Sequence, residues 1–455
     1  MNVFNQSFWL DEAISVKAAI LPLKDLLFVF SPGDFHPPLY YLVLKLWISI
    51  FGTSETAVRS LSLVFALLSV LLLFFIAKKL FNKFVAISSA SLLATAPLLF
   101  YYSQEARMYA MSVFASLLVV WCFINIVYNK NSRMLNWVSF IISSSLLIYT
   151  DYLPGLVLLF CAAFLIFQKK SLGVHRFAWI TSFITILILF IPWLAIFKKQ
   201  LEVGVQVKQN APIWWETLGK TNLKQITLVP VKFLIGRISF YNKFVYAAFV
   251  GLFAFEFGIS LWNSLKKYKE SHLVWLWFLI PLSGALIFGL IMSGFSYFRL
   301  LFLLPPFYLL VAHGIFLVNK KTGKLYFRVG LNLLAISIFA FTPRFWREDW
   351  RSAVLWLESD AKGQSAISIF VTKSQQDPYM YYAKNVPSYG PDGLEGVYFE
   401  KIYLFRYVQP IFDPTDQVRK SVEGMGFTKV EERDFNGVTV WKYQNASKNL
   451  AAPEP

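Results

Sequence analysis

Two adjacent carboxylates, Asp11 and Glu12, follow a short apolar stretch in a chain of which only 15% of the residues are charged. A carboxylate within hydrogen-bond reach of a substrate hydroxyl can act as its general base. Neighbouring side chains point in different directions in a strand or a helix, so the two acids should do different work. We predict that Asp11 is the base and that Glu12 pairs with a cation or donor that orients the segment. Taken alone, the pair favours the plainer alternative, in which both acids stabilise the start of a helix.

His36 is the next candidate, because it precedes Pro37 and Pro38. The residue before a proline is held extended, so this imidazole has a defined position. A lone histidine is more often a hydrogen-bonded structural group than a ligand. No neighbouring cysteine or second histidine at ligand spacing indicates a metal site here.

The stretch SQEARMYAM, residues 103–111, supplies Glu105 and Arg107. We expect Ser103 to cap a helix on which Glu105 and Tyr109 share a face, four residues apart. Arg107 would face elsewhere and could meet an anion such as a phosphate, which suits the geometry of a guanidinium. A structural ion pair to another loop is the alternative reading of this segment.

Arg59 and Arg299 each stand at the end of an apolar run. Either could extend to lipid headgroups or bind a ligand phosphate, and for each arginine alone the first reading is favoured. The choice between these two readings depends on whether the arginines lie on the same side of the membrane as Asp11 and Glu12.

The composition indicates an integral membrane protein. Hydrophobic residues make up 57% of the chain, and the mean hydropathy is +0.54, whereas soluble domains have about a quarter of their residues charged. The net charge of +17 does not indicate nucleic-acid binding, because the basic residues cluster in short turns between apolar runs. The two cysteines lie inside apolar runs, which excludes a disulfide framework.

Ten apolar runs are long enough to cross a bilayer; they are residues 57–77, 84–102, 108–128, 135–150, 152–168, 177–197, 244–264, 272–293, 300–318 and 325–341. Lysine- and arginine-rich turns occur at every second connection, at 78–83, 129–133, 168–176, 264–271 and 318–324. The positive-inside rule makes these turns cytoplasmic and places the remaining connections on the outer side. All of the candidate residues above then lie on that outer side.

The first 56 residues form the first predicted unit. Residues 36–52 are too few to cross a bilayer and carry Tyr, Trp and Lys, so we predict a helix that lies on the outer membrane surface, with a second one over about 12–30. An outer N-terminal segment normally follows a membrane span. We therefore expect one further N-terminal span that the printed chain lacks.

The C-terminal part changes character at about residue 342. We predict a helix in 347–363, strands at 365–372 and 401–408, a capped helix in 413–426, and a hairpin over 428–443 that turns at Asn436 and Gly437. The predicted organisation is an outer loop (1–56), a transmembrane domain (57–341) with an outer loop at 198–243, an outer α/β domain (342–445) and a disordered tail (446–455).

Five motifs in order, FWLDEA, HPPLYY, AVRSLS, YYSQEARMYA and YFRLLFLLPP, resemble the membrane glycosyltransferases of superfamily C. The resemblance covers about residues 8–318. It is closest to the branch of dolichyl-phosphate-mannose protein mannosyltransferases and bacterial aminoarabinose transferases of lipid A. The resemblance implies an inverting transfer from a polyprenyl-phosphate sugar, with Asp11 as the general base and Glu12 as its partner. It implies substrate or donor-phosphate contacts at the remaining candidates, which are His36, Arg59, Glu105, Arg107 and Arg299.

We therefore expect a polytopic α-helical membrane protein with a C-terminal extracytoplasmic α/β domain. The expected function is a glycosyltransferase of the plasma (inner) membrane that uses a polyprenyl-phosphate sugar and a lipid, glycan or protein acceptor. Tyr40 stands where protein mannosyltransferases tend to have Gly, so a protein acceptor gains no support from that motif. No metal ligand is predicted, and assistance by a divalent metal is left open. A transporter or lipid flippase is the first alternative, although these carry polar groups near the bilayer midplane. A non-catalytic relative is the second.

Overall fold

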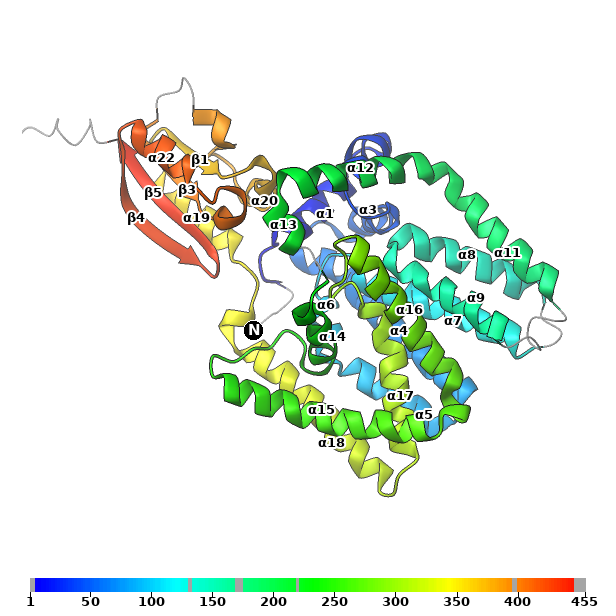
Figure 1. Ribbon diagram of the computed structural model, residues 1–455. Coiled ribbons are helices and arrows are strands. Elements are labelled where there is room, and N and C mark those ends of the chain that lie inside the picture. Colours follow the sequence, from blue (N-terminus) through cyan, green and yellow to red (C-terminus); the bar gives the residue numbers. More distant parts are fainter. Residues whose placement is uncertain (1–4, 130–132, 168–174, 218–220, 395–398, 446–455) are drawn as a thin grey trace, which may run out of the picture.

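The computed structural model describes residues 5–129, 133–167, 175–217, 221–394 and 399–445. A body of helices carries a small sheet-containing unit at one end, beside α1 (Leu10–Ile20) (Figure 1). The predicted tail at 446–455 lies outside the described residues, and the basic turns at 129–133 and 168–176 lie largely outside them.

Within the described residues, six helices are long and apolar enough to cross a membrane. They are α4 (Glu55–Leu80), α7 (Tyr109–Val127), the continuous stretch Arg176–Asn210 made of α11 (Arg176–Phe190), η5 (Ile191–Trp193) and α12 (Leu194–Asn210), α15 (Lys243–Lys266), α16 (Tyr268–Ile291) and α18 (Lys321–Phe341). Shorter apolar helices account for the four other predicted spans; they are α5 (Lys83–Ala94) with α6 (Pro97–Tyr102), α8 (Met134–Thr150), η4 (Leu153–Gly155) with α9 (Leu156–Phe167), and η6 (Leu301–Leu303) with α17 (Leu304–Phe316). The predicted polytopic helical fold is confirmed.

The N-terminal segment forms short helices: α1 (Leu10–Ile20), α2 (Leu23–Asp25), η2 (Leu26–Phe30), η3 (Ser31–Gly33) and α3 (Leu39–Phe51). At about 1.5 Å per residue, α3 is about 20 Å long, which is shorter than the hydrocarbon core of about 30 Å. A helix that lies at the membrane surface, as predicted for 36–52, fits this length. The start of α1 at Leu10 places Asp11 and Glu12 in its first turn.

Two predicted segments contain more local structure than the sequence pattern showed. The predicted span 84–102 is made of two helices with a break before Pro97, because proline lacks the N–H needed to continue a helix and instead begins α6. The predicted outer connection 198–243 contains helices, since α12 continues to Asn210 and is followed by α13 (Pro212–Thr217) and α14 (Leu223–Ile235). Neither α13 nor α14 has the long apolar run on which the prediction of spans relied.

The end of α14 packs closely on the start of α6. Gly236 has a φ of 67°, and a Cβ atom there would lie 2.9 Å from Cβ of Pro97. Only glycine allows both this backbone conformation and this approach. The turn places Arg237 against Tyr101, whose hydroxyl accepts a hydrogen bond of 2.5 Å from Nη1.

The C-terminal unit is a five-stranded sheet in the order β2-β1-β3-β5-β4. Its strands are β1 (Ala366–Phe370), β2 (Ser388–Tyr389), β3 (Lys401–Phe405), β4 (Phe427–Phe435) and β5 (Val438–Asn445), and its helices are α19 (Trp350–Asp360), α20 (Asp377–Tyr382), α21 (Gln409–Phe412) and α22 (Gln417–Gly424). The hairpin turn is confirmed, with positive φ at Asn436 and Gly437. Apolar clusters on both faces of the sheet, against α19 and against α22, explain why every residue of β1 and β3 is buried.

The C-terminal unit packs on the N-terminal helices. The hydroxyl of Ser7 donates to the carbonyl oxygen of Glu348 (2.6 Å), and the N–H of Phe8 donates to the hydroxyl of Tyr382 (2.8 Å). Lys17 of α1 forms an ion pair of 2.6 Å with Asp377. The two acids at the start of α1 therefore lie at the junction between the helical body and the sheet unit.

Candidate active site

Glu12 is fully buried and forms a two-pronged ion pair with Arg59 of α4. Arg59 donates from Nε to Oε1 at 2.8 Å and from Nη2 to Oε2 at 2.5 Å. The same guanidinium also donates to the carbonyl oxygens of Gln6 (2.5 Å) and Ser7 (3.0 Å). Since both side chains are 0% exposed, this pair anchors α1 and the residues before it to α4.

The charge of Glu12 is compensated from several elements. Burial opposes its ionisation, but the guanidinium groups of Arg347 and Arg59 outweigh burial and hold the pKa of Glu12 below its ordinary value. The N–H of Ala106 adds a hydrogen bond of 2.9 Å to Oε1. Glu12 therefore has the geometry of an ionised structural group that joins α1, α4 and the segment before α7.

Asp11 lies in a different environment from its neighbour. Its side chain is 34% exposed, and its Oδ2 lies 3.9 Å from Nε of Arg107. Among the described residues, that ion pair is the closest polar contact of the Asp11 carboxylate. An ionised carboxylate with open hydrogen-bonding capacity can accept a proton from a substrate.

Arg107 belongs to residues 103–108, which connect α6 to α7. The predicted helix in this segment is wrong, because the six residues form turns and bends. The hydroxyl of Ser103 instead donates to the carbonyl of Phe100 (2.9 Å). This irregular backbone lets Glu105 and Arg107 point into different surroundings.

A polar network joins Arg107 to His36. Nη1 of Arg107 donates to the hydroxyl of Tyr41 (3.2 Å), and Nη2 lies 3.3 Å from Nδ1 of His36. That ring nitrogen also lies 3.3 Å from Oδ1 of Asp34, and the Tyr41 hydroxyl donates to Oδ2 of Asp34 (2.5 Å). Burial opposes the ionisation of Asp34, yet His36, Arg107 and Tyr41 lower its pKa to about 2. The prediction omitted this carboxylate from the site.

Glu105 is almost fully buried, and its carboxylate pairs with an arginine. Nη1 of Arg347 lies 3.4 Å from its Oε2. Burial raises the pKa of Glu105 to about 7, with Arg347 acting against this shift and the carboxylate of Glu12 adding to it. Glu105 therefore changes its charge near neutral pH.

Arg299 lies between α16 and η6, and its buried Nε has no hydrogen-bond partner among the described residues. Its guanidinium acts electrostatically on Asp151 and on Tyr109, and Arg107 also acts on Tyr109. Burial raises the pKa of Asp151 against the opposing effects of His36 and Arg299. The two guanidinium groups thus both lie within electrostatic range of Tyr109, and the Nε of each has no hydrogen-bond partner among the described residues.

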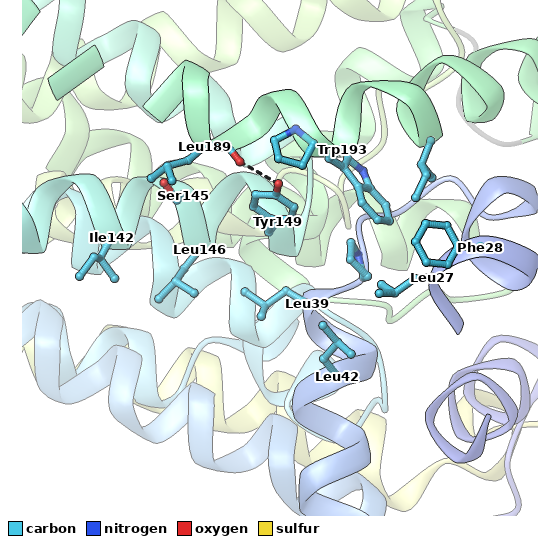
Figure 2. A pocket seen from close by; sticks show the side chains of 13 residues that line it. Leu27, Phe28, Leu39, Leu42, Ile142, Ser145, Leu146, Tyr149, Leu189 and Trp193 are labelled. Carbon is cyan, nitrogen blue, oxygen red and sulfur yellow. Dashed lines mark hydrogen bonds between the residues drawn. The ribbon is translucent and has the colours of Figure 1, made fainter. Parts of the chain in front are cut away.

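An apolar groove of about 520 Å³ opens beside this network (Figure 2). Its walls come from η2, α3, α8, α11 and α12, and its lining residues are Leu27, Phe28, Pro38, Leu39, Leu42, Ile142, Ser145, Leu146, Tyr149, Leu189, Pro192, Trp193 and Ile196. A chain of hydrogen bonds links its wall to His36: Nε1 of Trp193 donates to the Tyr152 hydroxyl (2.7 Å), which donates to Oε1 of Gln200 (2.6 Å). Nε2 of Gln200 donates to the carbonyl of His36 (3.1 Å).

Comparison with known proteins assigns this arrangement to a fold. A family model described as dolichyl-phosphate-mannose-protein mannosyltransferase matches residues 35–196. ArnT from Cupriavidus metallidurans aligns over 99% of this chain and 96% of its own, at 12% identity, with TM-scores of 0.57 in the apo state and 0.56 when bound to undecaprenyl phosphate. The chain has the fold of ArnT. The fold expected from the five motifs and the expected similarity to the mannosyltransferase branch are confirmed.

An archaeal relative of this fold is also similar. The Archaeoglobus fulgidus oligosaccharyltransferase, in a complex with Zn and sulfate, aligns over 98% of this chain and 70% of its own, at 12% identity and with a TM-score of 0.50. No curated protein sequence matches the chain.

Within this fold, the structure gathers Asp11, Glu12, His36, Arg59, Glu105 and Arg107 around the start of α1, and it places Arg299 within electrostatic range of Asp151. Arg347 was missed by the sequence analysis. The only signal was its position in the charged run REDWR, which sequence reasoning assigned to a helix. In the described part of the chain, no three side chains of His, Cys, Asp or Glu gather as metal ligands would.

Proposed function

We propose that this protein transfers a sugar from a polyprenyl-phosphate donor to an acceptor hydroxyl, with Asp11 as the general base. The observation that carries the proposal is the partly exposed Asp11 carboxylate, which lies opposite the buried guanidinium of Arg107. A proton acceptor and a phosphate-binding cation side by side suit a displacement at an anomeric carbon that carries a phosphate leaving group.

In the proposed step, the acceptor oxygen gives its proton to the Asp11 carboxylate and forms a bond to the anomeric carbon of the sugar. The bond between that carbon and the phosphate oxygen breaks, and its electron pair remains on the departing polyprenyl phosphate. A single displacement inverts the anomeric configuration. Arg107 and Arg299 stabilise the negative charge on the leaving phosphate.

Asp34 is a second carboxylate within electrostatic range of Arg107, and it is a weaker candidate for the base. Its Oδ1 already accepts from the N–H of Phe35 (2.8 Å) and contacts His36, and its Oδ2 accepts from Tyr41. A carboxylate whose pKa lies at about 2 is also a poor proton acceptor. Its proposed task is to orient His36 and Arg107.

The geometry changes the roles proposed for two other residues. The donors of Arg59 are directed at Glu12 and at two carbonyl oxygens, and its side chain is 0% exposed. Glu105 is buried against Arg347. We therefore assign the donor phosphate to Arg107 and Arg299, and we assign Arg59 and Glu105 to support of the site.

The apolar groove supports a polyprenyl donor. Its lining includes Pro38 and Leu39, two and three residues after His36, so a chain whose phosphate lies at Arg107 could extend into it. ArnT, which has a similar fold, was solved with undecaprenyl phosphate bound, and the description of the matching family names a dolichyl phosphate. We propose that isoprenoid units of the donor occupy this groove (Figure 2).

The proposed reaction takes place on the extracytoplasmic face of the plasma membrane. Arg59 and Lys78 lie near opposite ends of α4, about 28 Å apart at 1.5 Å per residue. The basic turn that begins at Lys78 belongs to the set that the positive-inside rule makes cytoplasmic, so the site belongs to the other side. This clustering of ionisable groups near one end of the helices also favours an enzyme over a transporter or flippase, whose polar groups gather near the midplane.

Membranes that contain the protein, incubated with a panel of radiolabelled polyprenyl-phosphate sugars, test this function. We expect the label of one donor to move into a lipid, glycan or protein fraction, and the fraction identifies the acceptor. A flippase would move labelled donor across the bilayer without breaking its sugar–phosphate bond. Release of no label from any donor, together with no translocation, would favour the non-catalytic relative.

A further inference from the structure

The segment that joins α18 to the C-terminal unit inserts a guanidinium into the candidate active site. Arg347 is only 6% exposed. Its Nη1 lies 3.4 Å from Oε2 of Glu105 and 3.7 Å from Oε2 of Glu12, and its Nη2 donates to the carbonyl of Gln104 (2.8 Å). The guanidinium also lies over the ring of Tyr101, 5.0 Å from its centroid.

These contacts fall on two different segments. Glu12 belongs to the segment that carries Asp11, and the N–H of Arg347 donates to Oε1 of Gln6 in the same segment (3.0 Å). Gln104 and Glu105 belong to the segment that carries Arg107. Arg347 therefore bridges the chain that presents the base and the chain that presents the phosphate-binding cation.

The hairpin of the C-terminal sheet holds Arg347 in place. Nδ2 of Asn436, at the hairpin turn, donates to the carbonyls of Trp346 (3.1 Å) and Arg347 (2.8 Å). The N–H of Asp349 donates to the carbonyl of Phe435, on the strand that enters the turn (3.0 Å). The position of the guanidinium thus depends on the docked sheet unit.

We infer that Arg347 is a positioning residue of the transfer site, through which the C-terminal unit sets the separation between Asp11 and Arg107. This inference rests on the proposed function. Arg347 touches no reacting atom. It acts through Glu12 and Glu105, whose carboxylates share its guanidinium.

Simple attachment of the C-terminal unit does not require this buried cation. Two other ion pairs, Lys17 with Asp377 and Arg351 with Glu55, already connect the unit to the helical body, and their cations are 50% and 33% exposed. A buried cation is costly unless its partners compensate it. Because Arg347 is buried beside two acids of the site, a role in their geometry is the better explanation.

Arg347→Met in the full-length protein tests the inference. We expect kcat for sugar transfer to fall about 10²-fold, as misplacement of a catalytic group by about 1 Å can cause, with the KM for the donor nearly unchanged. The matched control is Arg351→Met, which removes an arginine from the same interface but contacts neither acid, and its kcat should stay near the wild-type value. Equal losses in both variants would reduce Arg347 to an attachment contact, and a wild-type kcat in folded Arg347→Met would overturn the inference.

Charge compensation gives a second measurement. Arg347→Met leaves Glu105 without its closest cation, so adding Glu105→Gln to it should restore part of kcat. Arg347→Lys should lose less kcat than Arg347→Met, because the ammonium keeps the positive charge. It should still lose some, because an ammonium cannot reach both Glu105 and the Gln104 carbonyl as a planar guanidinium does. Arg347→Lys also serves if the methionine variant fails to fold. A double variant no faster than Arg347→Met, together with full loss in Arg347→Lys, would contradict the charge-based role.

Hydrogen exchange separates this inference from the proposed function. We expect Arg347→Met, but not Arg351→Met, to speed amide exchange in both residues 6–15 and residues 103–108. If the wild-type protein transfers no sugar while exchange responds in this way, the proposed function fails and the bridging role stands. If exchange in both segments is unchanged, the bridging role fails, whatever the activity.

Discussion

Asp11 and Arg107 face each other with 3.9 Å between Oδ2 and Nε, although one lies in the first turn of α1 and the other in the turn before α7. The buried pair of Glu12 and Arg59 fixes the first element, and Arg347 links it to the second. The proposed base is thereby held beside the cation that we propose binds the leaving phosphate.

Loss of Arg299 should weaken binding of polyprenyl phosphate. Its Nε has no hydrogen-bond partner in the described chain, so Arg299→Gln should leave the fold intact while it removes a charge-assisted contact. Such contacts contribute about 1.5–3 kcal/mol, equivalent to a rise in Kd of about 10- to 100-fold. Binding of polyprenyl phosphate to purified protein measures this. Arg419→Gln, on the exposed helix α22, is the control, and equal Kd values for the two variants would contradict the assignment.

Filling the apolar groove should select against long donors. Leu146→Trp adds bulk to the groove lining, so the KM should rise for a donor of many isoprene units and change little for a donor of one or two. Leu67→Trp is the matched control, because Leu67 is 61% exposed on the surface of α4, away from the groove lining. The chain-length dependence of kcat/KM measures the effect, and uniform loss across lengths would place the isoprenoid chain elsewhere.

Transfer should depend on pH through Glu105. Burial raises its pKa to about 7, so its carboxyl gains a proton as the pH falls through that value, and its ion pair with Arg347 is then lost. The charged groups that act on it are Arg347, Glu12, Arg237 and Asp11. We expect kcat/KM to fall below about pH 7.

Two matched variants test this pH dependence. In Glu105→Gln the fall in kcat/KM below about pH 7 (the acid limb of the pH profile) should disappear, and in Glu55→Gln it should remain. The Glu55 carboxylate forms an ion pair with Arg351 and accepts a hydrogen bond from the hydroxyl of Tyr382. Persistence of the limb in Glu105→Gln would assign it to another group.

Breaking the Glu12–Arg59 pair should destabilise the protein. Glu12→Gln leaves the Arg59 guanidinium buried without its countercharge, and removal of one partner of a buried ion pair costs about 3–5 kcal/mol. We expect a clear fall in Tm in detergent. The double variant Glu12→Leu with Arg59→Met should be more stable than Glu12→Gln, since it leaves no buried charge unpaired. An unchanged Tm in Glu12→Gln would show that the pair is not a main anchor.

Patterns local in sequence predicted much of this fold. Asn436 and Gly437 specify their turn by backbone conformation alone, and the apolar runs specify the helices of the membrane body. The motif order placed Asp11 and Arg107 in one site before any distance was known. These features depend on residues close together in the chain or on side-chain type.

Features that depend on packing between distant segments could not be predicted. Arg347 reaches Glu12 and Glu105 only because the hairpin docks against the start of α1. The irregular backbone at 103–108 looked helical because the residues of SQEARMYAM are good helix formers, but tertiary contacts override that preference. Asp34 joins the site only through its contacts with His36 and with Tyr41, which the sequence did not indicate.

The most direct test is the rate of sugar transfer by Asp11→Asn, with the donor that the labelled panel identifies. The amide keeps the size of the side chain but cannot accept the proton, so kcat should fall by about 10²- to 10⁴-fold. Binding of polyprenyl phosphate and the Tm should stay close to those of the wild type. Transfer at the wild-type rate by the folded Asp11→Asn variant would contradict the role of Asp11 and, with it, the proposed mechanism.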